Sequence, residues 1–355
     1  MTSGLPQPPI HGGIHLPPHV ALDRYFRAQI RNYDTVDDGL AEQIEDWKKN
    51  YTGQSRGKTR LSTLAGQFRE LIEDNGAFAL WQTERAAKRY LAYRRQVGVT
   101  SYFLKPVTVG NISEDATSHH CEDAVNLLTL SARFKKKDSF FGIGNTGLFL
   151  TRHALERTYE RTEIPEGKFR DLIETDINDL IIGIAVSEAA DLWIESDVNR
   201  VSAVPFSNGL MLLNTRIVYC GADHPGLGWH NSLPSGKFQS PFVNTGIVLD
   251  HLCSDRLNAV VGTFTLTYLN TLDLRDDQLN YYYAFQQLKE ALGEKVGHAL
   301  AVMSFAPNLA HEDLGRYPLN DLYAEKVRKL NGLLRSGWLN ADKPQFEAFI
   351  MHFDL

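Results

Sequence analysis

The sequence predicts an α+β protein with a helical N-terminal domain, then an α+β domain with an antiparallel sheet, and finally a helical C-terminal tail. Two observations lead to this fold class. Apolar residues recur every three or four positions over residues 20–99, as in amphipathic helices, whereas short apolar runs separated by turn residues dominate after residue 138. Helices followed by strands, rather than helices alternating with strands, favour α+β over a doubly wound sheet.

The first 137 residues are expected to form an arm and a helical domain. Residues 1–20 contain five prolines, which fix φ and remove backbone donors, so an extended arm is expected there. In the helical domain, residues 21–137, a break at Asn75-Gly76 precedes a further helix over 77–93. A short strand is expected over 103–109 and another helix over 121–134.

The second domain is expected over residues 138–292. Thr151 is a helix N-cap candidate before a helix over 152–161, and Pro165 separates it from a second helix over 169–195. Turn signals such as Ser207-Asn208-Gly209 indicate an antiparallel meander. Its expected strands cover residues 201–204, 209–213, 216–219, 245–249 and 257–269, and they include Leu210–Leu213, Ile217–Tyr219 and Val260–Thr267. A helix over 276–292 and a helical segment over 293–355 complete the chain.

Composition narrows the class of protein. The 355 residues are 43% hydrophobic and 23% charged, which is typical of a globular chain and not of a disordered or membrane protein. The net charge of −6 argues against a protein that coats nucleic acid. Three widely spaced cysteines without a CxxC pair indicate a reducing compartment, so a cytoplasmic location is expected. The N-terminus has no secretory signal and no window is apolar enough to span a membrane.

The most distinctive motif is the segment from Leu150 to Arg161, LTRHALERTYER. On a helix, steps of four residues turn by only ~40°, so His153, Arg157 and Arg161 share one stripe. A stripe of imidazole and guanidinium groups suits an anion such as a phosphodiester. The alternative is a solvated helix face with ordinary ion pairs, because Arg152–Glu156 and Arg157–Glu160 also have the right spacing.

This motif, HAxxRxxxR after a short apolar strand, resembles the opening helix of RNase toxins of the barnase/EndoU/colicin/RelE-like superfamily, in which a helix precedes an antiparallel sheet. The resemblance covers about residues 138–292 and implies metal-independent cleavage of RNA by its own 2′-hydroxyl, with His153, Arg157 and Arg161 at the phosphate. It also implies a polar residue on a later strand. The candidates are Thr263 and Thr265, which fall on one strand face together with Thr267.

Two features depart from that resemblance. Residues 138–292 contain 11 Lys and Arg against 20 Asp and Glu, an acidic balance that does not favour RNA binding. The long N-terminal domain is also foreign to compact toxins. A non-catalytic protein-interaction protein with a degenerate toxin-like fold is therefore the alternative. For the ribonuclease, RNA and a neutralising or delivery protein are the expected partners, and neither a cofactor nor a metal is expected.

Three weaker signals remain open. Gly142, Gly144 and Gly147 spell GxGxxG, but no buried strand precedes them and no helix opens within them, as a dinucleotide site requires. The residues from His119 to Asp123 include metal-ligand types, yet no second pair with zinc spacing follows. The irregular segment over 221–241 is a candidate substrate loop.

Overall fold

The computed structural model describes residues 16–28, 61–74, 78–86, 95–112, 119–135, 139–162, 166–195, 200–221, 257–305 and 323–339, with single positions at 43, 46, 47, 49 and 164. Its strands are β1 (Phe78–Ala86), β2 (Arg95–Ile112), β3 (His119–Lys135), β4 (Ser139–Thr151), β5 (Ile194–Glu195), β6 (Arg200–Phe206), β7 (Gly209–Gly221) and β8 (Leu257–Asn270). They form one sheet in the order β1-β2-β3-β4-β8-β7-β6-β5.

The sheet consists of two antiparallel meanders that meet at one parallel pair of strands. Strands β4 and β8 run in the same direction, with Leu148 opposite Thr263 and Phe149 opposite Phe264. The two phenylalanine rings stack with their centroids 4.8 Å apart. We call this pair of strands the seam. The α+β class is confirmed, and the expected antiparallel strands at residues 210–213, 217–219 and 260–267 lie in β7 and β8.

The expectation of a purely antiparallel sheet is wrong at the seam. The connection from β4 to β8 is long and passes through helices and three further strands, so β8 can return beside β4 in the same direction. Nothing in the periodicity of either strand specifies this pairing.

The helices are α2 (Leu61–Asp74), α3 (Arg152–Thr162), α4 (Glu166–Ala189), α5 (Asp276–Phe305) and α7 (Ala324–Leu334), with a short 3₁₀ helix η1 (Thr271–Asp273) and helical residues 18–28. Helix α5 extends beyond the expected end at residue 292 and bends at Gly293, whose φ of 72° is left-handed. None of the helices in the described ranges is both long and apolar enough to cross a membrane.

Two expected helices are strands in the structure. Residues 77–93 were expected to be helical but contain β1, and residues 121–134 contain β3, which pairs with β2 along its whole length. In β3 consecutive residues from Ala124 to Leu128 are buried, because both faces of the strand are covered. A strand buried on both faces reads as a continuous apolar run, and local periodicity does not distinguish it from a buried helix.

The described part of residues 21–137 is therefore mostly strand, since β1, β2 and β3 occupy it. The change near Asp138 from helical periodicity to short apolar runs falls between β3 and β4. These two strands pair with each other. The four predicted domain ranges remain predictions, but one sheet extends across the position at which the second was expected to begin.

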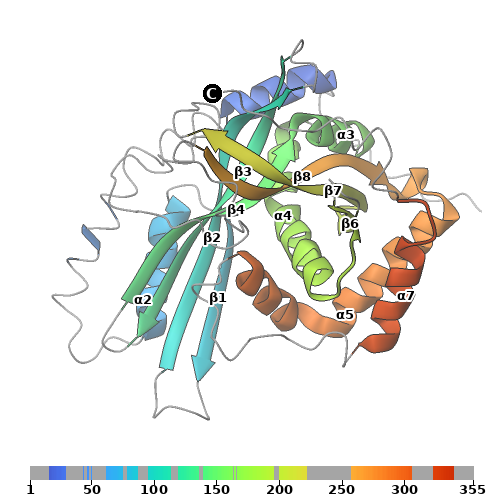
Figure 1. The fold of residues 1–355 in the computed structure, drawn as a ribbon. Coiled ribbons are helices and arrows are strands. Elements are labelled where there is room, and N and C mark those ends of the chain that lie inside the picture. The colour runs from blue at the N-terminus through green and yellow to red at the C-terminus, as the bar shows by residue number, and fades with distance from the viewer. Residues whose placement is uncertain are drawn as a thin grey trace, which may run out of the picture.

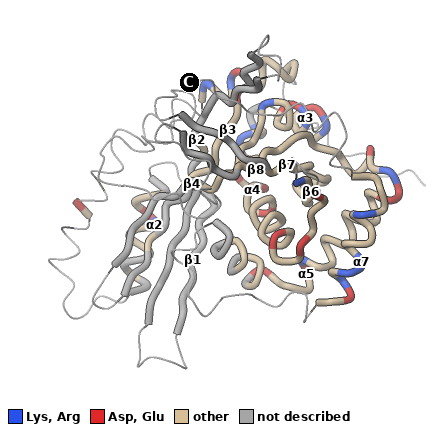
Figure 2. Tube along the Cα trace, in the orientation of Figure 1, with Lys and Arg blue, Asp and Glu red and all other residues tan. Residues whose placement is uncertain are grey.

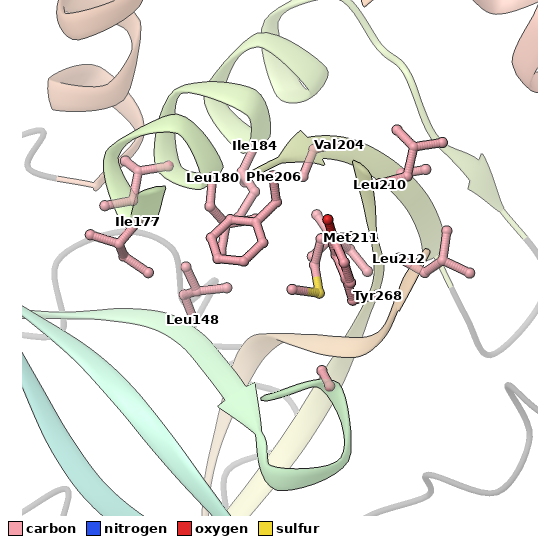
Figure 3. Packing of buried hydrophobic residues seen from close by; sticks show 14 of the residues in the cluster. Leu148, Ile177, Leu180, Ile184, Val204, Phe206, Leu210, Met211, Leu212 and Tyr268 are labelled. Carbon is pink, nitrogen blue, oxygen red and sulfur yellow. The ribbon is translucent and has the colours of Figure 1, made fainter. Parts of the chain in front are cut away.

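The core lies between the sheet and its helices (Figure 1). Helix α4 buries one face in its first half and every residue over 180–187, and Ile177, Leu180 and Ile184 lie opposite Phe206 and Met211 of the β6–β7 hairpin (Figure 3). Helix α5 packs against α4, and α7 packs against α5. Helix α4 packs against β6, and α3, which follows β4, packs against β8.

The N-terminal helical residues 18–28 join the same core. The Tyr25 ring meets the Phe169 ring edge-on at 5.5 Å, and Phe169 meets Tyr159 of α3 in the same way at 5.3 Å. The N-terminal helix is therefore attached to the α3–α4 unit.

Candidate functional site

Helix α3 begins where the sequence predicts, directly after β4. The Thr151 hydroxyl accepts a hydrogen bond from the Ala154 backbone N–H at 3.2 Å, which is the contact of an N-cap. The same hydroxyl donates to the Thr265 carbonyl oxygen at 2.7 Å. One threonine thus starts α3 and fastens it to β8, which positions the His–Arg motif at the seam.

Thr265 is buried and its hydroxyl is occupied within the protein. The hydroxyl accepts from the Thr151 backbone N–H at 3.0 Å and donates to the Phe149 carbonyl oxygen at 3.4 Å. Thr263, two residues earlier, shares a hydrogen bond of 2.9 Å with the hydroxyl of Thr215 on β7. Both threonines that were expected at a phosphate instead connect neighbouring strands.

Arg161 lies at the last turn of α3, and its guanidinium faces the end of β8. It donates a hydrogen bond to the Tyr268 carbonyl oxygen, and its Nε lies 3.7 Å from the Asp273 carboxylate. The Arg161 carbonyl oxygen in turn accepts from the Asn270 side-chain amide at 2.8 Å. Arg161 therefore holds the chain as it leaves β8, and only 28% of its side chain is exposed.

Arg157 is the more accessible arginine of the stripe. Its guanidinium pairs with the Glu160 carboxylate at 2.8 Å, and 43% of its side chain is exposed. Figure 2 shows that basic and acidic residues both occur along α3. An exposed ion pair of this kind contributes about 0–1 kcal/mol, so an anionic ligand would displace Glu160 at little cost.

His153 is exposed on the first turn of α3, one turn before Arg157. Partial desolvation and the positive charge of Arg157 lower the pKa of its imidazole below the ordinary value. The neutral form, which can accept a proton, is therefore favoured at neutral pH. Of the five predicted site residues, His153 and Arg157 share an accessible face, whereas Arg161, Thr263 and Thr265 are engaged in contacts within the protein.

Arg152 has a larger structural role than its sequence suggests. Besides the expected partner Glu156 at 2.9 Å, it pairs with Asp23 of the N-terminal helix at 2.7 Å and with Asp123 of β3 at 3.3 Å. It also donates to the His19 carbonyl oxygen. The contact to Glu156 follows from helical spacing, but the other partners are distant in sequence and had no local signal.

A second polar cluster lies at the β6–β7 turn and was not expected. Ser207 has a φ of 50°, which is left-handed and unfavourable for a residue with a Cβ atom. Burial raises the pKa of Asp176 on α4, and a hydrogen bond from Ser207 opposes that effect. Burial also raises the pKa of the Tyr268 phenol to about 12. The sequence indicated the turn at Ser207 but not the groups that surround it.

The remaining sequence signals are resolved only in part. Gly142, Gly144 and Gly147 lie inside β4, and α3 opens at Arg152, so the glycines do not begin a helix as a dinucleotide site requires. Among the described residues, His119 to Asp123 included, no group of three His, Cys, Asp or Glu side chains could hold a metal ion. The predicted substrate loop at 221–241 lies, apart from Gly221, outside the described residues, as does the predicted strand at 245–249.

Comparison with known proteins assigns neither a family nor a function to this chain. No family model matches the chain, and no curated protein and no solved structure matches it either. The resemblance to RNase toxins therefore stays a prediction that depends on the α3 motif and on the order of elements alone.

Proposed function

We propose that this chain is a non-catalytic protein-interaction protein in which the His–Arg helix has a structural role. The observation that carries the proposal is the use of Arg161 and Thr265: the guanidinium holds the end of β8, and the hydroxyl joins β8 to β4. A substrate phosphate would have to break contacts that hold α3 against the sheet. Loss of a buried hydrogen-bond partner costs about 1–3 kcal/mol, which is a large fraction of the stability of a domain.

The order of elements supports a degenerate toxin-like fold for this part of the chain. Helices α3 and α4 precede the β5–β8 meander, and this is the order that the resemblance implies. The acidic balance of residues 138–292 supports a partner other than RNA. A cytoplasmic location belongs to the same proposal, because the three cysteines form no CxxC pair.

The test is an assay of purified full-length chain with matched RNA and DNA oligonucleotides of one sequence. We expect no cleavage of either, and no difference between wild type and the His153→Ala variant. Cleavage of RNA but not of DNA by wild type, lost in His153→Ala, would overturn the proposal. Denaturation curves of both proteins would show that the variant is folded.

A second candidate function is a metal-independent ribonuclease that uses His153 and Arg157 only. Its support is the exposed face that these two residues share and the lowered pKa of the imidazole, which suits a general base. A substrate 2′-hydroxyl would be the nucleophile, and a neutralising or delivery protein would be its partner. This candidate predicts that EDTA leaves cleavage intact, and that Arg157→Lys is impaired because a point charge does not replace a guanidinium fork.

A further inference from the structure

The N-terminal helix, residues 18–28, is amphipathic. Its buried face is at most 6% exposed and consists of Ala21, Leu22, Tyr25 and Phe26. Its other face is exposed at His19, Arg24 and Arg27. An isolated helix this short is marginal in water, so its stability depends on the surface that its buried face contacts.

This helix is attached to the rest of the protein as a bound peptide would be. Among the described residues, no backbone-to-backbone hydrogen bond joins it to another element. Side chains of α3 and α4 hold it instead: Arg152 pairs with Asp23 at 2.7 Å, and the Phe169 ring meets the Tyr25 ring edge-on. We call Arg152 and Phe169, with Tyr159 against the Phe169 ring, the docking face. Figure 1 shows the helix in blue beside α3.

One atom of the helix does not suit the docking face. The Tyr25 hydroxyl is buried, and it has no hydrogen-bond partner among the described residues. A buried hydroxyl without a partner loses its hydrogen bonds to water and gains none in return, so it weakens the attachment of the helix. Phenylalanine at this position would make the same ring contact with Phe169 without that cost.

The ion pair that holds the helix is replaceable too. The Asp23 side chain is 47% exposed, so its pair with Arg152 is partly in contact with water and contributes little to the attachment. Arg152 also pairs with Asp123 and Glu156, which are not on the helix. These two contacts would keep the guanidinium in place if the helix left, ready to bind a carboxylate from another helix.

We propose that the docking face binds a partner protein and that the N-terminal helix is an autoinhibitory segment, which the partner displaces. The partner offers an amphipathic helix with a phenylalanine in the place of Tyr25 and a carboxylate two positions earlier, in the place of Asp23. A second copy of this chain is the less favourable occupant, because its helix would bring the same buried hydroxyl. The inference rests on the proposed interaction function and locates its surface.

The probes are two labelled peptides with the sequence of residues 16–28, one natural and one with Tyr25→Phe. Fluorescence anisotropy follows their binding to the full chain and to its Leu22→Asp variant, in which a charge on the buried face releases the chain's own helix. The variant should bind the Tyr25→Phe peptide roughly 5-fold or more tightly than the natural peptide. Wild type should bind both peptides roughly 10-fold or more weakly than the variant does, because its own helix competes at a high effective concentration.

The matched control is His19→Asp, which places the same charge on the exposed face of the helix and should bind the peptides as wild type does. A second measurement does not depend on the folding of Leu22→Asp. Tyr25→Phe in the full chain should slow amide hydrogen exchange over residues 18–28, because the helix then attaches without a buried unpaired hydroxyl.

Four outcomes would overturn this inference. They are peptide binding by Leu22→Asp no tighter than by wild type, equal or weaker binding of the Tyr25→Phe peptide, unchanged or faster exchange in the Tyr25→Phe chain, and a dimer of the wild-type chain that Leu22→Asp abolishes, which would assign the docking face to the helix of a second copy. The proposed function fails by a separate measurement, since specific RNA cleavage contradicts it whatever the peptides do.

Discussion

At the scale of single residues, the threonines and arginines around α3 show that side chains of one type have different roles according to their contacts. Thr265 was a candidate partner for a phosphate because strand alternation placed it on the same strand face as Thr263 and Thr267. Alternation does not reveal what lies opposite that face, and here it is the start of α3. A buried hydroxyl with both its donor and acceptor capacities used is a structural group.

We predict that Thr265→Val destabilises the fold by about 1–3 kcal/mol, because the Thr151 backbone N–H loses its partner in a buried position. Urea denaturation would measure the change. Thr267→Val, on the same strand and partly exposed, is the control and should change stability much less. Equal stability of the two variants would show that the hydroxyl of Thr265 is not needed at the seam.

The lowered pKa of His153 predicts a pH dependence of stability. A histidine whose folded pKa lies below its unfolded value binds more protons in the unfolded state, so stability is lost as pH falls below about 6.5. We expect His153→Gln to reduce that loss between pH 7.5 and 5.5, as followed by thermal melting. Arg157→Gln should reduce it too, since the positive charge of Arg157 contributes to the shift. Identical pH profiles of wild type and both variants would refute this account.

At the scale of elements, the β6–β7 hairpin contains a turn that the sequence predicts correctly. Ser207-Asn208-Gly209 connects the two strands as expected, and Gly209 begins β7. A Cβ atom on Gly209 would collide with the Leu269 carbonyl oxygen and lie 2.8 Å from the Tyr268 ring. The sequence indicates a turn here, but only the packing of β8 explains why this position must be glycine.

Two glycine substitutions should therefore have opposite effects. Gly209→Ala should destabilise the protein by about 3 kcal/mol or more, because the backbone of β8 must move. Gly332→Ala, in α7 with open space around it, should stabilise by about 0.5–1 kcal/mol through helix propensity. Differential scanning calorimetry of both variants would measure the loss and the gain of stability. Unchanged stability of Gly209→Ala would contradict the predicted collision of a Cβ atom at this position.

At the scale of the whole molecule, Arg152 connects three parts of the chain that are far apart in sequence. It reaches Asp23 of the N-terminal helix and Asp123 of β3 from its own position at the start of α3. The aromatic contact of Tyr25 with Phe169 adds an apolar attachment for the same helix. Together they explain why a helix from the predicted first domain is part of the core of the second.

We predict that Arg152→Gln loosens the N-terminal helix. Its three carboxylate partners would lose their common cation, and amide hydrogen exchange in residues 18–28 should become markedly faster. The control is Arg170→Gln, which breaks an exposed pair with Glu174 and should change stability by less than about 0.5 kcal/mol. Unchanged exchange in residues 18–28 would show that apolar packing alone holds the helix.

Local sequence determined the elements whose signals are short-range. The cap at Thr151, the helices α3 and α4, the turn at Ser207 and the strands β6, β7 and β8 all follow from capping, periodicity and turn chemistry, and the structure has them. The stripe of His153 and Arg157 also follows, since helical spacing alone places them on one face. Each of these features depends on residues within a few positions of one another.

Only the tertiary structure determined that β1 and β3 are strands and that β4 and β8 pair in parallel at the seam. It also determined which of the predicted site residues are accessible. Strand pairing joins residues that are distant in sequence, so an apolar run becomes helix or strand according to what lies beside it. The partners of Arg161 likewise come from β8 and η1, and those of Thr265 come from the end of β4, in each case more than 100 residues away along the chain. Whether a side chain is available for chemistry depends on such contacts, and a local pattern does not contain them.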